Sequence, residues 1–182
     1  MVEEAVWLTT TCGFDGVQWD YEICRDGDGG FLRLLDETRA ALPKGKLLSV
    51  ASECSYPGLL ARFGWSDGYF KEVAKRCDQM AVMCYDSGMF MPRWYVWFVQ
   101  RQAAVIPALV KQANPGCEVI LGLPTYGQGT ASHNPRAENL RLALKAVREA
   151  DGSPGPDGVA LFADYTTDDR DWAVYERWWV TK

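Results

Sequence analysis

Short apolar runs alternate with longer amphipathic stretches along the whole chain. Runs of strand length, rich in β-branched and aromatic residues, predict five β-strands, at residues 14–22, 46–52, 79–86, 118–124 and 158–165. Apolar residues at helical spacing predict helices at 2–11, 31–41, 69–76, from Tyr95 or Trp97 to 113, 135–150 and 168–179. Gly13 and Pro43 follow two of these helices as stop signals.

The order of these segments predicts the fold class. Every expected strand is followed by an expected helix, which is typical of a parallel sheet with right-handed crossovers. Strand starts near 16, 47, 79, 118 and 158 give a repeat of 31 to 40 residues, the length of one β/α barrel unit. Eight units need about 250 residues. The 182 residues are therefore expected to form a single α/β domain, an incomplete (β/α) barrel with five parallel strands.

An unclosed barrel has two unpaired edges and an open inner face. Both are aggregation hazards, so something is expected to cover them. We expect either that two copies associate as a homo-oligomer across the missing wall, or that the sheet flattens into an open layer.

The first strand gathers polar side chains on one side. Because side chains alternate along a strand, Gln18, Asp20 and Glu22 share one face, and Val17, Trp19 and Tyr21 share the other. Positions 20 and 22 are two residues apart, about 6.6 Å along the strand at roughly 3.3 Å per residue. This spacing suits a catalytic carboxylate pair, although such a pair on an isolated strand is more often a solvated face.

Composition narrows the possible partners. The net charge of −5 and the lack of a basic run argue against nucleic acid and anionic membranes. No apolar run is long enough to span a bilayer, and residues 1–4 lack the basic start of a secretory signal. The chain as it stands is expected to be cytoplasmic, or extracellular if an N-terminal region has been lost. Aromatic residues make up 13% of the sequence. Their rings can either pack in the core or stack on sugars.

The cysteines and the lone histidine do not predict a metal or cofactor site. The six cysteines contain no C-x-x-C pair, and His133 does not complete a zinc set with them at ligand spacing. We expect the cysteines to be reduced and to pack as small apolar side chains.

Three motifs in order resemble one known family. Residues 15–22 read Asp-Gly-Val-Gln-Trp-Asp-Tyr-Glu, which resembles the strand-four signature Asp-Gly-x-Asp-x-Asp-x-Glu of family 18 glycoside hydrolases, the chitinase-like TIM barrels. Residues 83–86 are similar to the family's Met-x-Tyr-Asp, and residues 122–127 to its Gly-x-Pro-x-Tyr-Gly. The resemblance covers strands four to eight and lacks the first three β/α units. Gln18 departs from the pattern, which has Asp there.

The resemblance implies a reaction and a set of site residues. It implies retaining, substrate-assisted hydrolysis of β-1,4-linked N-acetylglucosamine without a cofactor. Glu22 would be a partly buried general acid, Asp20 would orient the substrate acetamide, and Tyr85 would hydrogen-bond its oxygen. The implied substrate-binding residues are Gln18, Met83, Asp86, Tyr126 and Phe162, the last at a position where the family usually has Trp.

Two alternatives remain open. Chitinase-like lectins bind glycans without turnover, but they generally lose the acid that Glu22 retains here. The other alternative is a truncated barrel with no function of its own.

Overall fold

The strands form one parallel sheet. The computed structural model of the protein describes residues 1–22 and 24–181. The sheet has the order β1-β2-β3-β4-β5, with strands β1 Gly16–Asp20, β2 Leu47–Ser52, β3 Gln79–Met83, β4 Glu118–Pro124 and β5 Gly158–Phe162. The incomplete (β/α) barrel that the sequence predicts is confirmed.

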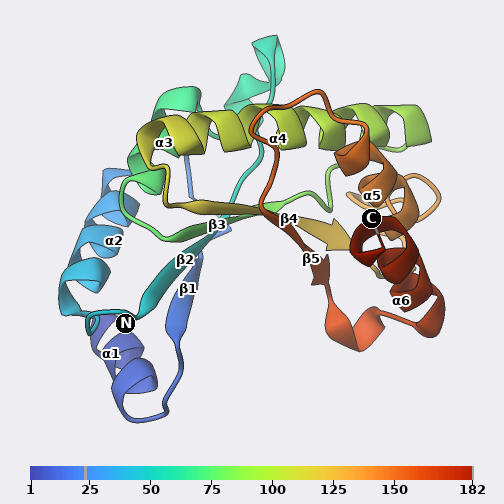
Figure 1. The fold of residues 1–182 in the computed structure, drawn as a ribbon. Coiled ribbons are helices and arrows are strands. Elements are labelled where there is room, and N and C mark those ends of the chain that lie inside the picture. The colour runs from blue at the N-terminus through green and yellow to red at the C-terminus, as the bar shows by residue number, and fades with distance from the viewer. Residues whose placement is uncertain (23, 182) are drawn as a thin grey trace. The chain divides into compact units, whose positions relative to one another are not determined.

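A helix follows each strand in the chain (Figure 1). The α-helices are α1 Val2–Thr10, α2 Gly29–Ala41, α3 Asp67–Ala74, α4 Pro92–Ala113, α5 Leu140–Arg148 and α6 Asp169–Tyr175. Short 3₁₀ segments cover Gly58–Phe63 and Asp164–Thr166, and a π turn at Glu176–Val180 continues α6. Side-chain caps start several helices; Asp28, for example, accepts hydrogen bonds from the N–H groups of residues 30 and 31.

The chain divides into two compact units. Unit 1 comprises Met1–Val82 and Ala108–Val119, and unit 2 comprises Met83–Pro107 and Ile120–Lys182. Unit 1 holds β1, β2 and most of β3, whereas unit 2 holds β5 and most of β4. That residues 1–182 form a single domain stays a prediction.

β3 and β5, like β1, end earlier than the sequence predicts. β3 ends at Met83 instead of residue 86, and Asp86 itself adopts φ 50°, a left-handed conformation that a strand does not contain. β5 ends at Phe162 instead of residue 165, because the N–H groups of Thr166 and Thr167 turn back to the Ala163 carbonyl.

Helix starts also differ from the prediction. α4 begins at Pro92 rather than at residue 95 or 97, because the N–H groups of residues 94 and 95 already bond to the Met91 carbonyl. α5 begins at Leu140 rather than at residue 135. The preceding Asn139 caps it, since its Oδ1 accepts a hydrogen bond from the Leu142 N–H.

The alternation of side chains along β1 is confirmed within unit 1. Trp19 points to the helix side, where its Nε1 donates to Oγ1 of Thr38 on α2 at 3.0 Å. Tyr21, just after the strand, lies 5.6 Å from the ring of Phe31 on the same helix. Gln18 points to the opposite face, where its Nε2 donates to Oγ of Ser49 on β2 at 3.0 Å.

In unit 2, α5 packs its apolar face inward. Its buried residues include Leu140, Ala143, Leu144 and Val147. Helices α5 and α6 contact each other and lie side by side near β5 in Figure 1.

Five of the six cysteines are buried, Cys12 being exposed. Within the residues described, no helix is long and apolar enough to cross a membrane.

The start of β1 leaves no room for a side chain larger than that of glycine. A Cβ added at Gly16 would lie 2.4 Å from the carbonyl oxygen of Leu47, its register partner on β2. We expect Gly16→Ala to lower the free energy of unfolding by about 1–3 kcal/mol, the usual cost of overpacking. Urea denaturation measures this loss.

The matched control is Gly29→Ala, in the first turn of α2. An added Cβ there meets only the Arg33 side chain, at 3.9 Å. That variant should match the wild type or gain up to ~1 kcal/mol from helix propensity. Equal midpoints for both variants would show that β1 and β2 separate at little cost.

Candidate active site

The predicted site residues are divided between the two units. Unit 1 carries Gln18 in the middle of β1, Asp20 at its C-terminal end and Glu22 just after it. Unit 2 carries Met83, Tyr85, Asp86, Tyr126 and Phe162, at or after the C-terminal ends of β3, β4 and β5. In β/α barrels the catalytic groups lie at these strand ends. That Asp20, Glu22 and Tyr85 converge on one substrate stays a prediction.

The end of β1 differs from the arrangement implied by the resemblance. The strand ends at Asp20, and the chain then turns, with the Cys24 N–H bonded to the Tyr21 carbonyl at 2.9 Å. Glu22 therefore lies in a turn beyond the strand, and its side chain is exposed. The expectation of a partly buried acid closing the first strand is wrong on both counts. Asp20 is also exposed.

A carboxyl that the sequence reasoning missed stands near Glu22. Glu53 follows β2 directly, and burial and then the Glu22 charge raise the pKa of its carboxyl. The parallel register pairs Asp20 with Ala51, and Glu22 and Glu53 each follow two residues later. The sequence does hold a signal for this pair: each glutamate lies two residues after a strand position, and those two positions pair with each other in the sheet. Unit 1 thus has two neighbouring carboxyls at the ends of β1 and β2.

Gln18 belongs to a row of polar side chains across unit 1. Gln18 donates to Ser49, Oγ of Ser49 donates to Oε1 of Gln79 at 3.1 Å, and Nε2 of Gln79 donates to Oε2 of Glu118 at 3.2 Å. These residues, together with Gly16 and Leu47, line a cavity of about 500 Å³. Substrate binding by Gln18 stays a prediction.

In unit 2 an aromatic cluster joins three predicted residues. The rings of Tyr85 and Phe162 stack with centroids 4.3 Å apart and planes 7° apart. Tyr126 meets the same phenyl ring edge-on at 6.1 Å. Thr125 holds the ends of β4 and β5 together, because its N–H donates to the Phe162 carbonyl at 2.8 Å and its hydroxyl donates to the Ala163 carbonyl. Phe162 is 41% exposed, so part of this apolar surface is open to a ligand.

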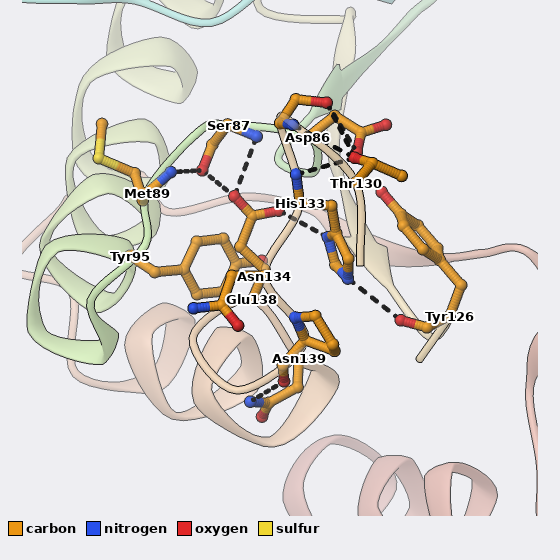
Figure 2. A network of polar contacts seen from close by, with 12 residues as sticks. Asp86, Ser87, Met89, Tyr95, Tyr126, Thr130, His133, Asn134, Glu138 and Asn139 are labelled. Atoms are coloured by element: carbon orange, nitrogen blue, oxygen red, sulfur yellow. Dashed lines mark hydrogen bonds and ion pairs between the residues drawn. The ribbon is translucent and has the colours of Figure 1, made fainter. Parts of the chain in front are cut away.

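Asp86 stands beside this cluster. Its Oδ1 accepts a hydrogen bond from Oγ of Ser132 at 3.4 Å. Burial, followed by the charge of Asp86, raises the pKa of the Tyr126 hydroxyl, which therefore stays protonated as a hydrogen-bond donor. Figure 2 shows both residues within a network of polar contacts. Aromatic faces beside a carboxylate can bind a sugar ring, whose C–H face is apolar and whose hydroxyls need acceptors.

A metal centre has no candidate in the described part of the chain. Among the residues described, no three His, Cys, Asp or Glu side chains are grouped so that they could hold an ion.

These features define a class of protein: an incomplete parallel β/α barrel with carboxylates and aromatic rings at the C-terminal ends of its strands. The sequence model of the glycosyl hydrolases family 18 matches residues 1–179. The chain belongs to this family. No curated protein matches it.

Solved structures show the same fold. A chitinase from Chromobacterium violaceum superposes with a TM-score of 0.65 and 16% identity over 100% of this chain and 71% of that one. A class V chitinase from Pseudomonas fluorescens gives 0.64 and 16%, over 96% and 70%. The spore cortex-lytic enzyme SleL from Bacillus cereus gives 0.51 and 18%, over 69% and 29%. The chain thus spans about 70% of the length of the two chitinases.

The raised pKa of Glu53 predicts a pH dependence of stability. The folded state holds the Glu53 proton more tightly than the unfolded state, so stability falls as the pH rises above the ordinary pKa of 4.5. We expect Glu53→Gln to make the melting temperature depend less on pH above 4.5 and to raise it at pH 7. We expect Glu22→Gln to reduce the same dependence, because it removes the repelling charge.

Thermal melts from pH 4 to 8 measure both effects. Glu37→Gln, an exposed residue of α2, is the matched control and should keep the wild-type slope. A Glu53→Gln protein that also keeps the wild-type slope would refute the assignment.

Proposed function

We propose that the chain is a glycosidase of the chitinase-like type, which cleaves β-1,4 linkages in glycans that contain N-acetylglucosamine. One observation carries the proposal: in a chain of family 18, the motif residues lie at or just beyond the C-terminal ends of parallel strands. The aromatic cluster of Tyr85, Tyr126 and Phe162 beside Asp86 supports it. Two of the solved neighbours are chitinases, which favours chitin oligosaccharides as the glycan.

The proposed mechanism uses the substrate as its own nucleophile. Glu22 gives its proton to the glycosidic oxygen, so that the leaving sugar departs as an alcohol. Asp20 orients the acetamide, whose carbonyl oxygen attacks the anomeric carbon and forms a cyclic oxazolinium ion. Tyr85 donates a hydrogen bond to this oxygen. Water then opens the ring from the opposite side, gives its proton to the Glu22 carboxylate, and restores both the acetamide and the acid.

The remaining motif residues have binding roles in this proposal. Phe162 provides an apolar face for the sugar that carries the acetamide, and Met83 packs against that sugar. Asp86 and Tyr126 hold its hydroxyl groups, one as acceptor and the other as donor. Gln18 faces the same side of β1 as Asp20 and binds the substrate there through its side-chain amide.

A fluorogenic di- or tri-N-acetylglucosamine substrate tests the activity. We expect the wild-type chain to release the fluorophore, and Glu22→Gln to lower kcat by roughly 10²-fold or more, the usual contribution of a general acid. Glu37→Gln, exposed on α2, is the control and should keep the wild-type rate.

Each other outcome has a meaning. Binding of tri-N-acetylglucosamine without turnover would favour the lectin alternative. Neither binding nor turnover would favour a truncated barrel without activity. Turnover that survives in Glu22→Gln would assign the acid to another residue. Glu53, whose pKa the Glu22 charge helps to raise, is the first candidate.

We also propose that two copies associate along the open edges of the sheet. β1 and β5 stand at the two ends of the strand order, so each pairs with one strand only in the part of the chain described. Unpaired parallel edges promote association with a further chain. Light scattering on the purified protein is expected to give twice the 20.4 kDa mass of the chain. A monodisperse monomer that binds no apolar dye would contradict this.

A further inference from the structure

A buried acid–base pair in unit 2 has no part in the proposed reaction. Glu138 and His133 lie between β4 and α5, and both side chains are fully buried. Nδ1 of His133 and Oε2 of Glu138 are 2.8 Å apart. Buried ionisable groups are costly unless they are paired and hydrogen-bonded, so such a pair must make several specific contacts.

Glu138 holds the loop that follows β3. Its Oε1 accepts a hydrogen bond from the backbone N–H of Ser87 at 3.0 Å and another from the Ser87 hydroxyl. The same hydroxyl accepts from the Met89 N–H at 3.2 Å, and the Gly88 N–H donates to the Ser132 carbonyl at 2.8 Å. Ser87 directly follows Asp86, whose φ of 50° lies in the left-handed region that most non-glycine residues avoid and that Asp tolerates better than most.

His133 holds the segment that follows β4. Its Nε2 lies 3.1 Å from the backbone carbonyl oxygen of Tyr126, and its ring lies 4.2 Å from the Tyr126 ring. A carbonyl oxygen can only accept a hydrogen bond, so Nε2 carries a proton. One further proton lies between Nδ1 and Oε2 of Glu138, which makes the pair neutral as a whole whichever atom holds it. Figure 2 shows the pair between Ser87 on one side and Tyr126 on the other.

We propose that Glu138 and His133 are positioning residues that hold Asp86 and Tyr126 in place for the sugar. Five residues form one connected set: Asp86 is joined to Ser87 through the backbone, Ser87 is hydrogen-bonded to Glu138, Glu138 to His133, and His133 to Tyr126. An apolar pair could fill the same volume, but it would leave the Ser87 N–H and the Tyr126 carbonyl without these partners. The effect on sugar affinity rests on the proposed function, whereas the effect on loop position does not.

Two substitutions at one position separate positioning from packing. Glu138→Gln keeps an oxygen for Ser87, and its amide N–H can donate to Nδ1 of neutral His133, so the set stays connected. Glu138→Ala breaks it. With the trisaccharide substrate we expect KM to rise roughly 10- to 100-fold in Glu138→Ala, since small displacements of binding groups cost that much. We expect KM to stay near the wild-type value in Glu138→Gln, and kcat to change less than KM in both variants.

Glu149→Ala provides the matched control. Glu149 is an exposed residue just after α5, and its Oε1 lies 3.9 Å from Nζ of Lys145. This variant loses a glutamate from the same unit, and its KM should not change. Ser87→Ala is a milder variant for use if Glu138→Ala does not fold. It removes one bond to Glu138, so KM should rise in the same direction but less.

A second measurement does not depend on sugar chemistry. In the wild type the Ser87 amide should be protected from hydrogen exchange, as followed by ¹H–¹⁵N NMR. Protection should persist in Glu138→Gln and be lost in Glu138→Ala. A wild-type protein that neither binds nor cleaves the sugar but shows this pattern refutes the proposed function and supports the positioning role. Unchanged Ser87 exchange in Glu138→Ala, or an equal rise of KM in the Gln and Ala variants, overturns the positioning role.

Discussion

Alternation of side chains along parallel strands is the constraint on which the rest of this structure depends. On β1, Trp19 bonds to Thr38 of α2 on one side and Gln18 bonds to Ser49 of β2 on the other. On β2, Leu48 and Val50 are fully buried, whereas Ser49 between them is not. One face of the strands therefore supplies the core beneath the helices, and the other face is free to carry polar and catalytic groups.

The strand ends have a second requirement, because backbone groups that leave the sheet there still need partners. Buried side chains supply them in unit 2. Thr125 donates its hydroxyl to the Ala163 carbonyl, Glu138 accepts from the Ser87 N–H, and His133 bonds to the Tyr126 carbonyl. Since partly satisfied polar networks are unstable, these bonds fix the loops as a set. Asp86 can thus keep a left-handed backbone next to an aromatic cluster.

The sequence was sufficient for the order of strands and helices and for the parallel sheet, because periodicity and spacing are local signals. It was not sufficient for Glu53, whose neighbour Glu22 lies 31 positions away and is brought close only by the register of β1 and β2. The sequence also did not reveal the buried contacts of Glu138. Residues 135–150 have helical periodicity, so position 138 is expected within a helix, whereas Asn139 caps α5 and leaves Glu138 before it. Strand ends were misplaced where one residue, such as Asp86, adopts a conformation that composition does not reveal.

Gln18 shows why a motif can change without loss of the fold. The row from Gln18 to Glu118 has a direction: each side chain donates to the next, and the row ends on a carboxylate, which only accepts. The first member must therefore donate. Aspartate at position 18 would instead need the single Ser49 hydroxyl proton, which already goes to Gln79. A carboxyl at position 18 would therefore interrupt the row of hydrogen bonds, whereas the amide of Gln18 completes it. Position 18 therefore adds no carboxyl to this face, and the carboxyl that interacts with Glu22 is that of Glu53, whose pKa the Glu22 charge helps to raise.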